Sequence, residues 1–262
     1  MQFKTLLLDQ QDGIVTLTLN QPEKKNAMTM ELGKEFSEAI AQIKNNLEAR
    51  VLIITGQGSS FSSGGDLQST FDQFEAPPAQ AKANIIKYYK TFLSVRDLDI
   101  PTIAVLKGHT IGAALCLALA CDMRIASTDT KMTMSFIKIG IHPGMGTSYL
   151  LPRLIGTAKA FEMCLTGDPI DIQEALRIGL VNHVVEPERL MEFSLDLARR
   201  IAKNPVVPAR FLKKSIYRGL HTDLESALDY ESSAQVICSF TEDMKEGLAA
   251  AREKRVPVFK GY

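Results

Sequence analysis

The hydrophobic pattern of residues 3–185 alternates between short apolar runs and amphipathic stretches. The short runs have the length and β-branched content of strands, whereas apolar residues spaced three and four apart favour helices. Strands are predicted at 3–8, 14–20, 51–55, 102–108, 123–127 and 181–185. Helices are predicted at 29–43, 81–95, 112–122, 149–155, 158–165 and 172–178. This alternation is typical of an α/β protein.

The pattern changes near Asn204-Pro205. From Pro187 onward it is helical to the end of the chain, with helices predicted at 190–202, 207–220, 224–238 and 242–255. We therefore predict an α/β core over residues 1–204 and a helical region over 205–262. The apolar residues of 207–220 exceed what one face of an isolated helix needs, which predicts that this region associates with another copy of the chain.

The chain is organised around the central segment from Thr102 to Gly146, where the strand TIAVLKG runs into a glycine turn and an apolar helix. Gly108 and Gly112 bracket a place where the backbone bends sharply and approaches a ligand closely. The first amides of the helix are unpaired and lie at the positive end of its dipole, which suits an oxygen that gains negative charge. The segment therefore predicts an oxyanion hole. The alternative is a buried strand and helix with no chemical role.

A second loop, GQGSSFSSGGDL, follows the buried strand VLIIT. Such a loop after a buried strand is where an α/β protein normally places its ligand. Its glycines and serines leave backbone amides free to point at that ligand.

Composition narrows the class of protein. The 262 residues carry 30 basic and 30 acidic side chains, so no basic excess indicates nucleic-acid binding. The four cysteines form no CxxC pair, which favours a reducing compartment. The longest apolar run, Ile111 to Cys121, is about half of the ~20 residues that a membrane span requires. We predict a soluble cytoplasmic protein with no metal site and no membrane contact.

Six segments in this order and spacing resemble the enoyl-CoA hydratase/isomerase (crotonase) superfamily. The segments are NQPEKKNAM, FSSGGDL, IPTIAVLKGHTIGAALCLALACDMRIAS, GIHPGMG, LTGDPIDIQEALRIGLVNHVV and EKRVPVF. The resemblance implies a spiral of ββα turns with an all-helical C-terminal trimerisation region. It also implies trimers or hexamers that act on acyl-CoA thioesters, with no cofactor beyond the coenzyme A of the substrate.

The family's functional positions transfer onto this chain residue by residue. The two oxyanion amides fall on Gly65 and Ala113. The positions that bind coenzyme A are Lys24, Lys25, Ala27, Ser62, Gly64, Asp66 and Leu67. Lys254 matches a basic position that reaches the nucleotide phosphates of a neighbouring subunit in some members. The alternative for Lys254 is a solvated charge on a terminal helix.

The chain departs from the family where hydratases carry two glutamates. Those positions are Cys116 and Phe136, and neither side chain can act as a carboxylate base. A positioned acid or base typically contributes ~10²- to 10⁴-fold in rate, so addition of water should be slow. The aspartate that some relatives use in the following loop is replaced by Gly144 or its neighbours.

His142 is the strongest substitute base, because the resemblance places its loop over the acyl end of the substrate. Its alternative is a histidine bonded to local backbone. Asp72 and Glu75 are weaker candidates, and Cys116 is expected to pack in the core rather than act as a nucleophile. Three functions remain open: an acyl-CoA lyase or isomerase with a non-standard base, a hydratase whose activity is weak, and a degenerate homologue that only binds acyl-CoA or assembles.

Overall fold

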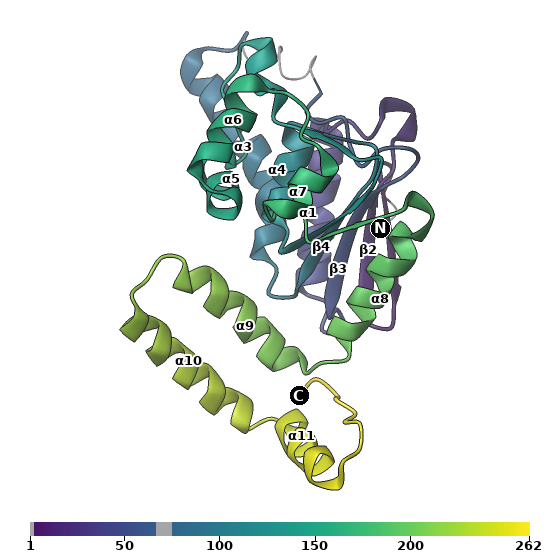
Figure 1. Cartoon of the computed structure of the whole chain (residues 1–262), viewed down its shortest axis with the longest axis vertical. Helices are drawn as coiled ribbons and strands as arrows, with labels where there is room; N and C mark the ends of the chain where they lie inside the picture. The colour runs from purple at the N-terminus through teal and green to yellow at the C-terminus, as the bar shows by residue number, and fades with distance from the viewer. Residues whose placement is uncertain (1–2, 67–74) are drawn as a thin grey trace.

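The computed structural model describes residues 3–66 and 75–262 of the chain. Within these residues the main sheet has six strands in the order β1-β2-β3-β4-β6-β8 (Figure 1). They are β1 (Leu6–Gln11), β2 (Ile14–Leu19), β3 (Val51–Gly56), β4 (Thr102–Leu106), β6 (Met123–Ser127) and β8 (His183–Val185). Strand β1 pairs antiparallel with β2, and every later pairing in the sheet is parallel.

The N-terminal hairpin confirms the predicted turn at Asp12-Gly13. Both residues have positive φ, 52° and 78°, as a tight turn between twisted strands requires. The prediction placed the first strand at 3–8, whereas the pairing of Gln11 with Ile14 extends it to the turn itself. Ladder hydrogen bonds, rather than apolar content, therefore set the end of this strand.

Helices cover both faces of the sheet. The α-helices of the described residues are α1 (Met30–Lys44), α3 (Pro78–Leu93), α4 (Ala113–Ala120), α5 (Thr147–Ile155), α6 (Thr157–Thr166), α7 (Ile172–Arg177), α8 (Leu190–Ala202), α9 (Val206–Gly219), α10 (Leu224–Ser239) and α11 (Glu242–Glu253). Short 3₁₀ helices lie at Pro22–Lys24, Ser94–Asp97, Ser135–Ile139 and Pro187–Arg189. Helix α3 begins before the predicted residue 81, because proline fits the first turn of a helix.

The wholly buried strand β3 shows how the two layers form. Its residues alternate, so that Val51 and Ile53 pack with α8 while Leu52 and Ile54 join the larger core that contains α1 and α4. A strand covered on both faces needs a continuous apolar sequence, and VLIIT provides one. The sheet is therefore held between two helical layers, and the loops at its ends are free to form a site.

A second, smaller sheet was not predicted. It pairs β5 (His109–Ile111) with β7 (Lys131–Thr133) in parallel. A bridge from Ser62 to Thr110 extends it on one side, and a bridge from Met132 to Ile170 extends it on the other. After each of the main strands β3, β4 and β6, the chain thus continues into the smaller sheet, as the Ser62 bridge, β5 and β7 respectively. This repetition gives a spiral of similar turns.

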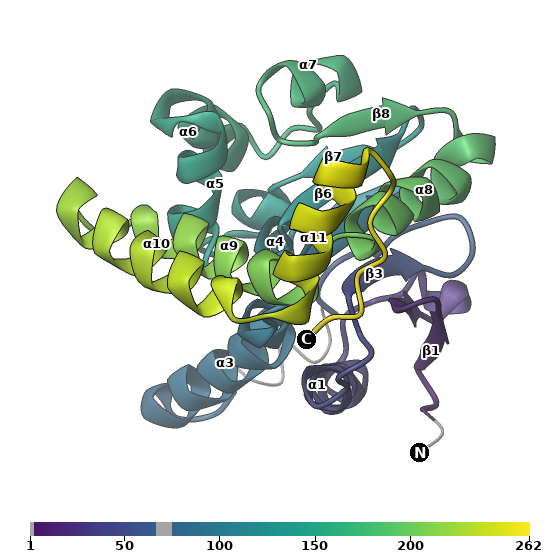
Figure 2. The ribbon, with the colours of Figure 1, turned by 90° about the horizontal axis from the view of Figure 1, so that it is seen from below.

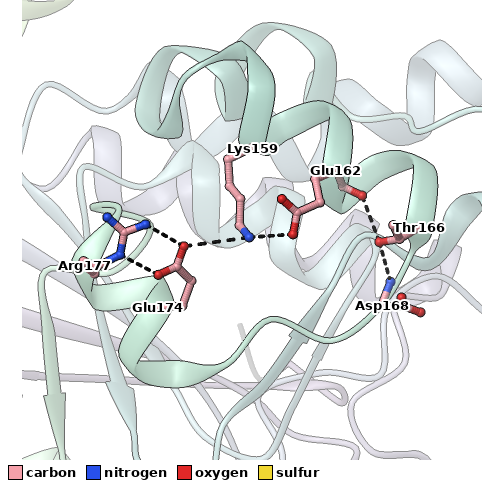
Figure 3. Close-up of polar contacts among 6 residues, drawn as sticks. All are labelled: Lys159, Glu162, Thr166, Asp168, Glu174 and Arg177. Atoms are coloured by element: carbon pink, nitrogen blue, oxygen red, sulfur yellow. Dashed lines mark hydrogen bonds and ion pairs between the residues drawn. The ribbon is translucent and has the colours of Figure 1, made fainter.

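An ion-pair network joins α6 to α7 (Figure 3). Lys159 Nζ lies 2.6 Å from Glu162 and 3.8 Å from Glu174, and Glu174 also binds Arg177. Asp168 lies nearby, but the described residues hold no group of three ligating side chains that suits a metal ion. The pair of Lys159 with Glu174 links α6 to α7, so we assign the network a structural role.

Helices α9, α10 and α11 extend away from the α/β part of the molecule (Figure 1). A view from below agrees that α9 and α10 lie side by side (Figure 2). Asp122, directly before β6, joins α9 to the sheet: it accepts a hydrogen bond from Tyr217 and pairs with Lys213 at 2.9 Å. No helix in the described ranges is long and apolar enough to span a membrane.

Candidate active site

A cavity of about 570 Å³ opens between α3, the start of α4 and the segment that follows β7. It is lined by Ser63, Gly65, Ile85, Tyr88, Tyr89, Ile111, Gly112, Ala113, Ser135, Phe136, Ile139, Ile141, His142 and Met145. Among these residues there is no aspartate, glutamate, lysine or arginine. The wall is mostly apolar, and its polar side chains are serine, tyrosine and histidine. A mostly apolar cavity with few polar groups is the usual form of a small-molecule site.

A bridge with Met28 orients the backbone of the serine-glycine loop. Met28 N donates to Gly64 O at 2.8 Å, and Asp66 N approaches Met28 O at 3.5 Å. In a parallel bridge, the residue between the two that bond to the partner directs its own amide away from that partner. Here this residue is Gly65, which lies between Gly64 and Asp66. The bridge therefore directs the amide of Gly65 away from Met28, and Gly65 lines the cavity.

A second bridge brings the glycine turn beside this loop. Ser62 N donates to His109 O, and Ile111 N donates to Ser62 O. The two backbones pass so closely that a Cβ added to Gly64 would lie 2.3 Å from Ile111 O. Gly64 also has φ +92°, so only glycine suits this position. The loop that contains Ser62, Gly64 and Gly65 is therefore packed against the backbone that leads into the first turn of α4.

Helix α4 begins at Ala113, as the sequence predicted for a start near Gly112. Gly112 has φ 53° and ψ −112°, and its amide donates to Thr133 O at 2.8 Å. Among the described residues the amides of Gly65 and Ala113 donate no hydrogen bond. Two unpaired amides beside one cavity, one of them at a helix N-terminus, can stabilise an oxygen that gains negative charge.

The predicted coenzyme A positions lie on two adjacent segments. Ser62 Oγ donates to Asn26 O at 2.7 Å and accepts from Gly64 N at 3.0 Å, while Ser63 N donates to Lys25 O. Lys24 and Lys25 are exposed, whereas Ala27 and Asn26 lie inward. Leu67 and Asp72 lie outside the described residues. Lys254 ends α11 in an exposed position and does not line the cavity.

Asn26 is a buried residue of the site region that the sequence did not single out. Its side-chain amide donates to the carbonyl oxygens of Gln57 and Ser60 at 2.9 Å, and its oxygen accepts from Gln21 N. Its φ of 54° is tolerated better by asparagine than by most residues. Asn26 thus ties the lysine-containing segment to the loop after β3.

Cys116 is wholly buried on α4. Its sulfur lies 3.0 Å from Thr147 Oγ1, and burial raises the pKa of the thiol to about 12. A thiol with this pKa stays protonated at neutral pH and is a poor nucleophile. Its burial agrees with the expected packing role.

Phe136 and His142 both line the cavity, on the segment after β7. The Phe136 ring lies close to Gly112, where an added Cβ would be 3.6 Å from it. His142 is exposed at the cavity edge, so it is accessible to a ligand. Glu75 is exposed and does not line the cavity.

Two tyrosines of α3 line the cavity and were missed by the sequence analysis. Tyr88 Oη donates to Met28 O at 2.9 Å, which supports the segment that orients Gly65. Tyr89 is adjacent and meets Tyr88 edge to face. Two aromatic residues in an amphipathic helix are normally core residues, so periodicity alone does not indicate that they face a cavity.

Known proteins share this fold and match this sequence along nearly its whole length. The family model described as enoyl-CoA hydratase/isomerase matches residues 9–262. A short-chain-enoyl-CoA hydratase of Clostridium acetobutylicum is 34% identical over 256 residues, which cover 97% of each chain. A trans-2-decenoyl-[acyl-carrier-protein] isomerase of Streptococcus mutans is 32% identical over the full length of both chains. A crystal structure of an enoyl-CoA hydratase from Bacillus anthracis has a TM-score of 0.93 at 33% identity, over 99% of this chain and 100% of that one.

The chain belongs to the enoyl-CoA hydratase/isomerase family. The predicted fold class is confirmed: a crotonase-type α/β spiral followed by a helical C-terminal region.

Proposed function

We propose that the chain binds an acyl-CoA thioester with the thioester oxygen at the amides of Gly65 and Ala113. The observation that carries this proposal is the pair of unpaired amides beside an apolar cavity. The segments 24–27 and 62–67 would hold the coenzyme A portion. The relatives named as acting on enoyl-CoA support this substrate class, and the isomerase relative suggests that a carrier-protein thioester is a second form of it.

We further propose that the reaction is proton transfer within the acyl chain rather than addition of water. Cys116 and Phe136 stand at the positions of the two hydratase glutamates, and no described residue that lines the cavity carries a carboxylate. An apolar chamber that is short of water favours proton transfer. His142 would remove a proton from carbon and return it to another carbon, while the amides stabilise the enolate oxygen.

A second candidate function is binding without catalysis. The same absence of carboxylates favours it, because a thioester held by two amides still needs a base to react. In both cases we expect the chain to act as a trimer or a dimer of trimers in the cytoplasm. Lys254 would then contact the nucleotide phosphates bound to a neighbouring subunit.

The first prediction separates these functions. We expect the wild-type protein to bind short acyl-CoAs in a calorimeter but to hydrate crotonyl-CoA far more slowly than the ~10 s⁻¹ typical of enzymes. Gly65→Pro removes one amide donor and should abolish turnover, whereas Gly65→Ala keeps the donor and serves as the matched control. His142→Ala should abolish isomerisation of a 3-enoyl-CoA and leave binding intact.

Each outcome has a separate meaning. Absence of binding to every acyl-CoA would refute the proposed substrate class. Hydration at ordinary enzymatic rates would refute the account of the missing glutamates. Binding without any turnover would leave the second candidate as the function.

A further inference from the structure

The phenol of Tyr89 occupies the space above Gly144. A Cβ added to Gly144 would lie 2.1 Å from the Tyr89 hydroxyl oxygen and 2.5 Å from the ring carbon that carries it. Side chains do not approach one another this closely, so no larger residue fits at position 144 while Tyr89 holds this position. The Tyr89 side chain, which itself lines the cavity, therefore occupies the space that a side chain at position 144 would need.

The hydroxyl of Tyr89 differs from that of its neighbour Tyr88. Tyr88 donates to Met28 O, whereas the Tyr89 hydroxyl has no hydrogen-bond partner among the described residues. Half-burial, with a smaller contribution from Cys116, raises the pKa of Tyr89, so the phenol keeps its proton at neutral pH. Tyr89 thus presents a neutral hydrogen-bond donor to a largely apolar cavity.

A donor in this position discriminates between ligands. A hydrocarbon chain beside Tyr89 would remove water from the hydroxyl without replacing its hydrogen bond, which costs free energy. An oxygen atom on the ligand would accept that bond. Since no lysine or arginine lines the described cavity, a neutral oxygen fits better than a carboxylate.

We infer that Tyr89 is a specificity residue that donates a hydrogen bond to a hydroxyl or keto oxygen on the acyl chain of the bound thioester. This inference rests on the proposed function, because the amides of Gly65 and Ala113 already account for the thioester oxygen. Among acyl thioesters, it predicts a preference for those whose acyl chain carries an additional neutral oxygen.

Calorimetry with three probes tests the inference: butyryl-CoA, 3-hydroxybutyryl-CoA and acetoacetyl-CoA. We expect the wild type to bind at least one of the two oxygenated probes more tightly than butyryl-CoA. Tyr89→Phe should reduce that preference roughly 3- to 10-fold, the worth of one hydrogen bond, and leave butyryl-CoA binding unchanged. Tyr88→Phe is the matched control. It removes the hydrogen bond from Tyr88 to Met28 O, which affects the segment near Gly65 and should change all three affinities alike.

An unchanged preference in Tyr89→Phe, or an equal loss for all probes, would overturn the role of Tyr89 alone. No binding of any probe by the wild type would overturn the proposed function and this inference with it. The placement of the phenol is tested separately by thermal unfolding. Gly144→Ala should lower the melting temperature, and Tyr89→Leu should restore part of that loss in the double variant; additive effects would contradict the close contact.

Discussion

At the scale of single residues, several buried polar side chains near the cavity hold backbone in place rather than face a ligand. Asn26 joins its own segment to the loop after β3 through its side-chain amide. The Ser62 hydroxyl donates to Asn26 O and accepts from Gly64 N, so it holds the serine-glycine loop against the same segment. Cys116 does the same for the loop at 144–147, through contacts with Thr147 and the Gly144 carbonyl. These contacts fix the backbone around the site, whereas the bridge with Met28 and the start of α4 direct the two unpaired amides.

The buried thiol of Cys116 predicts a dependence of stability on pH. Its pKa is raised from 9.0 to about 12, so between these values the folded chain keeps a proton that the unfolded chain has lost. The free energy of unfolding should therefore be unaffected below about pH 9 and fall above it, by about 1.4 kcal/mol per pH unit for this group. Urea unfolding at several pH values between 8 and ~10.5 measures this slope.

Cys116→Ser removes the titrating group and keeps a hydroxyl beside Thr147. Above pH 9, the free energy of unfolding of this variant should fall less steeply with pH than that of the wild type, by the contribution of one thiol. Cys238→Ser is the control, because Cys238 is only half-buried and should change the slope less. Equal slopes in the wild type and Cys116→Ser would show that this thiol is not held protonated by the fold.

At the scale of elements, local signals predicted most of the helices. Thr29, Asp223 and Thr241 each cap a helix by accepting a hydrogen bond from a backbone amide, close to where the sequence placed a helix start. The glycine turn predicted the start of α4 for a different reason: Gly112 makes no side-chain cap, but its positive φ allows the backbone to turn sharply into the helix. Strands β5 and β7 were missed because each has three residues, and their pairing joins segments distant in sequence.

The site was predictable only in part. Glycine and serine patterns indicated which loops leave amides free, and the family resemblance assigned Gly65 and Ala113. Tyr89 carried no such signal, and Asn26 was covered only as part of the segment 24–27, without a role of its own. The contact of Tyr89 with Gly144 joins α3 to a loop more than fifty positions later, and nothing in the local sequence specifies such a packing contact.

One largely buried carboxylate, that of Asp122, helps attach α9 to the sheet. Asp122 accepts from Thr102 and Tyr217 and pairs with Lys213, and the two charged side chains are 18% and 9% exposed. Removal of one partner from such a pair leaves the other charge without compensation. We expect Asp122→Ala to lower the free energy of unfolding by roughly 3–5 kcal/mol, measured by urea denaturation.

Lys214→Ala is the matched control on the same helix. Lys214 pairs with Asp99 at 2.8 Å, but these side chains are 48% and 47% exposed. An exposed pair contributes about 0–1 kcal/mol, so this variant should remain close to the wild type. Similar losses in the two variants would contradict the view that burial makes Asp122 a strong attachment of α9.

At the scale of the whole molecule, the C-terminal helices expose more apolar surface than one chain can cover. Leu212 and Ile216 of α9 and Leu220 directly after it are 57–60% exposed, and Phe240 after α10 is 80% exposed. Helices α9 to α11 also stand away from the sheet, so the α/β part does not cover all of this surface (Figure 1). Contiguous apolar surface of this kind usually lies in an interface between proteins.

We therefore predict self-association through this region, as a trimer or hexamer. Light scattering at micromolar concentration should report three or six times the 28.9 kDa of one chain. The double variant Leu212→Glu with Ile216→Glu should be monomeric, because an interface does not tolerate unpaired buried charges. Leu47→Glu is the control: Leu47 is 81% exposed but lies in the α/β part, and its replacement should leave the oligomer intact. A monomeric wild type would refute the prediction, as would dissociation of the Leu47→Glu control to the same extent as the double variant.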